Sequence, residues 1–139
     1  MALKDKLEII KNITVINECL IDYTGPICIF GTLDLVFIKD KVTVISATLS
    51  EDNFAIINGK VPSWVNSVNK NKSDDNILVI TDIDKVSLEK QGLLIDIIEN
   101  NHISTVELPK NLKVVLHSNT KCELNDKIRP LLECYNIDL

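Results

Sequence analysis

The stretch NILVITDIDKV, residues 76–86, places four consecutive apolar residues before two carboxylates. The run ILVI at 77–80 is continuously apolar rather than alternating, which is typical of a strand buried on both faces. Asp82 and Asp84 follow this run and are separated by one isoleucine. The stretch therefore predicts a buried strand with an acidic carboxyl end. The two carboxylates suit either a metal or nucleotide site, or a polar cap on a helix that is expected to begin near Val86.

Apolar runs of the same kind recur along the chain, and helical patterns separate them. Residues 87–101, SLEKQGLLIDIIENN, repeat apolar residues at Leu88, Leu94, Ile95 and Ile98, which is a helical spacing. Continuous apolar strands that alternate with helices favour a parallel sheet covered on both faces. We therefore expect an α/β fold with a mostly parallel sheet of about five strands and helices on both faces. The other strands are expected within PICIFG (26–31), LDLVFIKDKVTVISATLS (33–50), LKVVLHSN (112–119) and CYNIDL (134–139).

Four other segments carry helix signals. Residues 3–20 form an amphipathic pattern, and Ser50 precedes two acidic residues as a helix-capping serine does. Pro62 fits the first turn of a helix, and residues 123–132 predict a short helix that Pro130 ends. The segment 32–60 allows either a hairpin insertion or the remnant of a helix. The helix after Pro62 is expected to carry Trp64, Val65 and Val68 on one side.

The composition is that of one globular domain, which we expect to span residues 1–139. Hydrophobic residues make up 45% of the chain and charged residues 25%, and no segment is apolar for long enough to cross a bilayer. The N-terminal residues MALKDKLEIIKN contain no signal-peptide core, so a cytoplasmic location is expected. The net charge is −5 and the lysines do not cluster, which disfavours broad binding to nucleic acids.

The cysteines do not predict a metal site. Cys19, Cys28, Cys122 and Cys134 form no C-x-x-C pair and have no closely spaced histidine. In a chain without targeting signals they are expected to be reduced and mostly buried. His117 lies in the apolar run LKVVLHSN, which favours a core or strand-end histidine over a catalytic one.

In parallel sheets, ligands bind beyond the carboxyl ends of the strands, where Asp82, Asp84 and Asn119 are expected. In the order of its patterns, the segment 76–138 resembles the second half of an AAA+ ATPase core of the P-loop class. In that family this half holds a Walker B strand ending in Asp-Glu, a helix, a sensor-1 strand ending in Asn, and a helix leading to an arginine finger. The resemblance implies a P-loop-like three-layer sandwich. A strand 77–81 at the edge of the sheet, away from 27–30, would count against it.

The resemblance implies a role for each residue at the strand ends, and the departures from the family are informative. Thr81 stands where the family has its metal-holding Asp, and Asp82 stands at the position of the catalytic Glu. Asp84 matches an acidic position that more often supports catalysis than performs it. Asn119 matches sensor 1, which helps to position the attacking water. If a nucleotide site is retained, Asp82, Asp84 and Asn119 are its candidate residues.

The chain also lacks the other parts of an ATPase site. A phosphate loop needs glycines and a lysine followed by Ser or Thr, but ICIFG is followed by TLDLVFIKDK, and Gly59-Lys60 is followed by valine. The arginine-finger position falls at Pro130 or Leu131, with Arg129 adjacent but not aligned. ATP hydrolysis by this chain alone would therefore lack its main electrostatic contributions, and we expect neither catalysis nor a bound cofactor.

Three functional hypotheses follow. The favoured one is a non-catalytic AAA+-like domain that acts through protein contacts, with a partner ATPase or with its own copies. The first alternative is a module that binds ATP and magnesium and is completed by a partner ATPase subunit. The second is a small α/β enzyme of unknown substrate that uses Asp82, Asp84, His117 or Cys122 near the strand ends.

Overall fold

A computed structural model of the chain describes residues 25–33, 42–56, 59–70, 76–103 and 105–137. The helix expected over residues 3–20 and the thiol of Cys19 lie outside these residues. Residues 34–41 and 57–58 also lie outside them, so the choice between a hairpin insertion and a helix remnant for the segment 32–60 stays a prediction.

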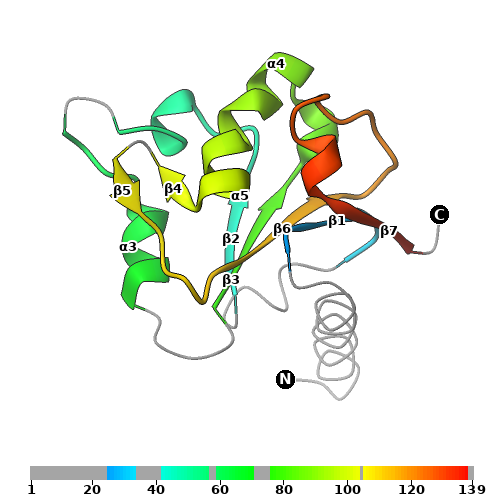
Figure 1. The fold of residues 1–139 in the computed structure, drawn as a ribbon. Coiled ribbons are helices and arrows are strands. Elements are labelled where there is room, and N and C mark those ends of the chain that lie inside the picture. The colour runs from blue at the N-terminus through cyan, green and yellow to red at the C-terminus, as the bar shows by residue number, and fades with distance from the viewer. Residues whose placement is uncertain (1–24, 34–41, 57–58, 71–75, 104, 138–139) are drawn as a thin grey trace, which may run out of the picture.

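Five parallel strands form the centre of the fold (Figure 1). Their order across the sheet is β2-β3-β6-β1-β7, and every neighbouring pair runs parallel. The expected α/β class and the five-stranded parallel sheet are therefore confirmed. The strands are β1 (Ile27–Gly31), β2 (Thr43–Ser46), β3 (Ile77–Thr81), β6 (Lys113–Ser118) and β7 (Glu133–Ile137).

Strand β3, which contains the run ILVI, lies inside the sheet. β3 pairs with β2 on one side and with β6 on the other, and β6 separates it from β1. Four of its residues, 77–80, are buried. A strand covered on both faces has no solvent side to which polar residues could be assigned, which explains its continuous apolar sequence.

Alternate residues of the inner strands contribute to two hydrophobic cores, one on each face of the sheet. Cys28 and Phe30 of β1 belong to the first core, and Ile27 and Ile29 belong to the second. The described helices contribute buried residues to the first core only. Within the part of the chain that the structure describes, helices therefore cover one face of the sheet. The expected three-layer sandwich, with helices on both faces, is not confirmed by these residues.

The helix after Pro62 forms as the sequence predicts. Helix α3 spans Ser63–Lys70, and its buried residues are Trp64, Val65 and Val68. The indole Nε1 of Trp64 donates a hydrogen bond of 2.7 Å to the carbonyl of Asn53, which lies in the 3-10 helix η1 (Glu51–Asn53). Ser50 precedes η1 as expected, but its hydroxyl bonds the Asp52 carboxylate instead of capping the helix backbone.

The predicted helix over residues 87–101 consists of three shorter helical segments in succession. These are α4 (Leu88–Gln91), the 3-10 turn η3 (Gly92–Leu94) and α5 (Ile95–Asn100). Leu94 and Ile98 are buried as predicted, whereas Leu88 is 39% exposed and Ile97 is buried instead. The buried residues Gln91, Leu94 and Ile98 are spaced by three and four residues, so they share one face across the 3-10 turn.

The C-terminal part differs from expectation at two points. Residues 102–107 form a small antiparallel hairpin of β4 (His102–Ile103) and β5 (Val106–Glu107), which the sequence analysis missed. The short helix expected to stop at Pro130 is instead the 3-10 helix η4 (Arg129–Leu131), which contains this proline. Proline is tolerated in the first turn of a helix because the amide there has no intrahelical partner.

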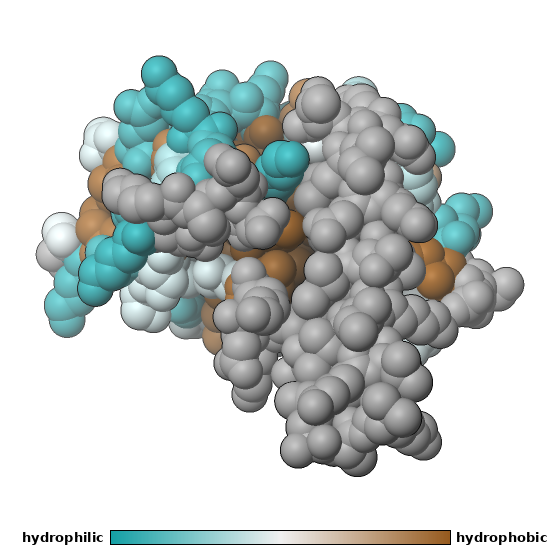
Figure 2. Space-filling model, turned by 90° about the horizontal axis from the view of Figure 1, so that it is seen from below, coloured by the Kyte–Doolittle hydropathy of each residue, from teal (hydrophilic) through white to brown (hydrophobic). Residues whose placement is uncertain are grey.

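The outer surface is mixed in character. In the view from below, hydrophilic residues gather on one side of the described surface, and apolar residues are visible beside them toward the middle (Figure 2). Among the described residues, no helix is long and apolar enough to span a membrane.

Candidate functional site

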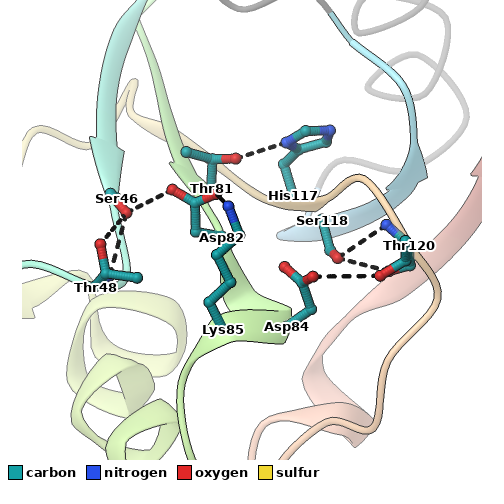
Figure 3. A network of polar contacts seen from close by, with 9 residues as sticks. All are labelled: Ser46, Thr48, Thr81, Asp82, Asp84, Lys85, His117, Ser118 and Thr120. Atoms are coloured by element: carbon teal, nitrogen blue, oxygen red, sulfur yellow. Dashed lines mark hydrogen bonds and ion pairs between the residues drawn. The ribbon is translucent and has the colours of Figure 1, made fainter.

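Polar side chains gather at the carboxyl edge of the sheet, where four neighbouring strands end (Figure 3). Ser46 ends β2, Thr81 ends β3, Ser118 ends β6 and Gly31 ends β1. Parallel strands bring their carboxyl ends to one edge, which is where ligands bind in open α/β sheets. Asp82 follows β3 directly, so this acidic residue lies at the edge that the sequence predicts.

His117 bridges the ends of three strands. Its Nδ1 lies 2.7 Å from the Thr81 hydroxyl, and its Nε2 lies 2.9 Å from the Gly31 carbonyl oxygen. A carbonyl oxygen only accepts, so Nε2 carries the proton and donates it to Gly31. In the neutral imidazole Nδ1 is then an acceptor, and the Thr81 hydroxyl donates to it. The strand-end interpretation of His117 is therefore confirmed.

The surroundings of His117 keep its ring neutral. The side chain is 1% exposed. Burial lowers the pKa of His117, while the hydrogen bond to the Gly31 carbonyl and the charges of Asp82 and Asp84 act in the opposite direction. Desolvation disfavours the imidazolium form more than these acceptors favour it, so the bridge exists in its neutral form at pH 7.

Asp82 is held by groups from its own loop and from β2. The Ser46 hydroxyl donates a hydrogen bond of 2.6 Å to Oδ2, and Lys85 Nζ lies 3.2 Å from Oδ1. The hydrogen bond from Ser46 lowers the pKa of Asp82, and Lys85 lowers it further, against the opposing effect of burial. The backbone of Asp82 is left-handed, with φ of 63°. Aspartate tolerates this conformation better than most residues.

Asp84 belongs to a second, more exposed group of contacts. The Thr120 hydroxyl donates to Asp84 Oδ2 over 3.3 Å, which connects the loop after β3 to the loop after β6. Ser118 Oγ donates to the Thr120 carbonyl over 2.5 Å and accepts from the Thr120 amide over 3.2 Å. Asp84 thus helps to hold two loops together, and its side chain is exposed.

The interpretation of the two aspartates as helix caps is wrong. The first α-helix after β3 begins at Leu88, and Ser87 caps it by accepting a hydrogen bond of 3.1 Å from the Lys90 amide. Asp82 precedes the 3-10 helix η2 (Ile83–Lys85) but makes no side-chain cap. The carboxylates point instead toward the neighbouring strand ends, which local sequence rules cannot detect.

Asn119, the third candidate, is exposed and takes no part in the contacts drawn in Figure 3. It follows β6 directly, so the backbone brings it to the same edge as Asp82 and Asp84. Three participants had no sequence signal at all, namely Ser46, Lys85 and Thr120. A serine, a lysine or a threonine near a strand end is too common to single out, and only the pairing of the strands brings these three to the aspartates.

Among the residues that the structure describes, the cavity next to Cys122 does not include the other residues proposed for a small enzyme. A cavity of about 330 Å³ is lined by Cys122, together with residues of β7 and of the loop after β6, but not by Asp82, Asp84 or His117. A hydroxyl that donates to a neutral imidazole can begin a nucleophilic reaction. Here the other ring nitrogen donates to a backbone carbonyl rather than to a carboxylate, so the imidazolium that must form gains little support. Thr81 and His117 are therefore better described as a structural bridge.

Within the described residues, no group of three or more His, Cys, Asp or Glu side chains is arranged to hold a metal ion. A comparison of the sequence with known protein families and with curated proteins finds no match.

Proposed function

We propose that this chain is an AAA+-like domain that does not hydrolyse ATP and acts through protein contacts, with an intact ATPase or with its own copies. The order of the strands supports the relationship to the P-loop class. A strand 77–81 at the edge of the sheet would count against the resemblance, whereas β3 lies inside the sheet between β2 and β6. β6, which ends just before Asn119, lies between β3 and β1.

The same order argues against the other common doubly wound folds. In the dinucleotide-binding and flavodoxin-like orders, the first strand neighbours the second. In this chain β1 neighbours β6 and β7, and β2 lies at the far edge of the sheet. The proposal therefore rests on a topological feature as well as on the order of sequence patterns.

One observation carries the non-catalytic part of the proposal: the polar groups at the carboxyl edge bond to one another. Thr81, at the position of the metal-holding Asp, donates to His117, and Asp82, at the position of the catalytic Glu, is held by Ser46 and Lys85. A general base must reach the proton that it removes, and a magnesium ligand must offer free oxygens. Both side chains are instead engaged within the protein.

Magnesium and ATP fit these residues poorly. Magnesium in nucleotide sites is bound by carboxylates and substrate phosphates, and the neutral hydroxyl of Thr81 supplies no negative charge. The chain from Gly31 onward offers no glycine-rich backbone to surround phosphates. AAA+ family members assemble side by side. A domain of this kind that has lost catalysis can therefore still act through the surfaces that contact its neighbours.

Calorimetric titration of the purified protein with ATP and ADP, with and without magnesium, tests the proposal. We expect no heat of binding from the wild type, because the phosphate loop and the metal carboxylate are both absent. We expect the same from Thr81→Asp, because one restored carboxylate does not replace a phosphate loop. Thr81→Val, which has the same shape without the hydroxyl, is the matched control for disturbance of the His117 bridge.

The unfolding curve of each variant shows that the titrated samples are folded. Magnesium-dependent binding of ATP by the wild type that disappears in Asp82→Asn or Asn119→Ala would contradict the proposal. It would support the module completed by a partner subunit, because these side chains would then contact the nucleotide.

A further inference from the structure

Two cysteines that are far apart in the sequence lie opposite each other on neighbouring strands. Cys28 of β1 pairs with Cys134 of β7, in the register of a parallel sheet. Paired residues of neighbouring strands point to the same face, and the strands lie about 4.8 Å apart. Disulfides need Cα atoms about 4.4–6.8 Å apart, so the spacing of the two strands lies within the range that a disulfide requires.

The two thiols differ in access. Cys28 is fully buried in the first core, whereas Cys134 is exposed. Cys134 also lines the cavity of about 330 Å³, together with Cys122, Lys121 and Arg129. The expectation that the cysteines are mostly buried is therefore wrong for Cys134. A small oxidant in this cavity can reach the sulfur of Cys134 but not that of Cys28.

The charge around Cys134 favours its reactive form. The hydrogen bond with Cys28 and the charge of Arg129 lower the pKa of Cys134 and outweigh burial and the Glu133 charge, so that it falls to about 7. Lys121, Glu123 and Asp126 are the other charged residues that line the cavity. The thiolate is the nucleophilic form of cysteine, so a lowered pKa favours reaction at Cys134.

We propose that Cys134 is a peroxide-sensitive thiol and that Cys28 resolves its oxidised form as a disulfide between β1 and β7. This inference does not depend on the proposed AAA+ relationship, because it rests on the register of two strands and on a cavity that neither Asp82 nor Asp84 lines.

The chemistry balances with a peroxide as the oxidant. The Cys134 thiolate attacks one peroxide oxygen, the O–O bond breaks, and hydroxide leaves; the sulfur is oxidised by two electrons to a sulfenic acid. The Cys28 sulfur then attacks the Cys134 sulfur. The S–O bond breaks, and the hydroxyl leaves with the Cys28 proton as water.

Cys122 is the competing thiol, and its surroundings argue against it as the first site of oxidation. Burial raises the pKa of Cys122, and the charge of Asp84 raises it further. It also lies in the loop between β6 and η4, without a register that fixes it opposite Cys134. Cys28 is held opposite Cys134 by the ladder between the two strands, so we expect it to resolve the sulfenic acid first.

The test is peptide mapping by mass spectrometry after treatment of the folded, reduced protein with hydrogen peroxide. Trypsin leaves Cys19 and Cys28 in one peptide, because no lysine or arginine lies between them. Cleavage before aspartate separates them at Asp22 and also separates Cys122 from Cys134 at Asp126. We expect the peptide with Cys28 to be joined to the peptide with Cys134.

Variants separate the two steps. In Cys28→Ser the linked peptide disappears, and Cys134 is trapped as a sulfenic acid by a dimedone probe. In Cys134→Ser neither product forms, whereas Cys122→Ser, the matched control, gives the same linked peptide as the wild type. A disulfide of Cys134 to Cys19, to Cys122 or to a second chain as the main product would overturn the proposal. Oxidation of wild-type Cys134 beyond the sulfenic acid without a link to Cys28 would overturn it as well.

Discussion

At the scale of single residues, His117 connects the carboxyl ends of β3 and β1. Its two ring nitrogens satisfy the Thr81 hydroxyl at the end of β3 and the Gly31 carbonyl at the end of β1. A buried polar group without a partner costs about 1–3 kcal/mol, so this bridge removes two such penalties at once. In the proposed AAA+ relationship, the Thr81 hydroxyl takes the position of the metal-holding Asp.

The lowered pKa of His117 makes stability depend on pH in a defined direction. The folded state binds a proton less readily than the unfolded chain, whose histidine titrates near 6.5. Lowering the pH through 6.5 therefore protonates the unfolded state first, and the free energy of unfolding falls until the pH reaches the folded pKa. Asp82 acts in the same direction at lower pH: its stabilisation is present above the ordinary value of 3.8 and is lost as the pH falls through its lowered pKa.

Urea unfolding at a series of pH values between neutral and mildly acidic measures this effect. We expect the wild type to lose stability as the pH falls below 6.5, and we expect a flatter curve for His117→Gln, whose amide does not titrate. Equal slopes for the two proteins would show that another group is responsible.

At the scale of elements, the segment between β3 and α4 contains one residue that caps the helix and two that make tertiary contacts. Ser87 caps α4, whereas Asp82 and Asp84 hold neighbouring loops. Ser87→Ala removes the cap, and we expect it to lower the free energy of unfolding by about 1 kcal/mol. Ser87→Asp, which can also accept from the helix amide, should retain most of the stability.

The matched comparison is Asp84→Ala, measured by the same chemical unfolding experiment. Asp84 is exposed and its bond to Thr120 is long, so we expect a change of less than about 0.5 kcal/mol. A larger loss for Asp84→Ala than for Ser87→Ala would restore the view that the aspartate caps the helix.

At the scale of the whole molecule, β2 and β7 are the outer strands of the sheet among the described residues. The residues of β7 are exposed or only partly buried along its length. The outer strands of a sheet are places at which protein chains can associate. If the domain assembles with its own copies, sedimentation equilibrium at increasing protein concentration should show a rising average mass. The mass of a monomer at every concentration would contradict self-association. The proposed protein contacts would then have to be made with a different chain.

The sequence by itself determined the strands β1, β3, β6 and β7, one helix face and the class of the fold. The run ILVI and the run in LKVVLHSN are continuously apolar because both faces of their strands are covered, and this property is local and readable. Trp64, Val65 and Val68 were placed on the buried side of α3 for the same reason, because helical spacing brings them together. The position of Asp82 beyond a strand end followed from these elements.

The tertiary structure alone decided which strand ends meet, and therefore what the polar residues do. Ser46 and Asp82 are 36 residues apart, as are Thr81 and His117, and His117 is 86 residues from Gly31. The pairing of Cys28 with Cys134 depends in the same way on β1 lying beside β7. Burial patterns record whether each strand is covered but not which strand is its neighbour. Strand order arises from the packing of the whole sheet, so the contacts between strand ends cannot be read from any local pattern.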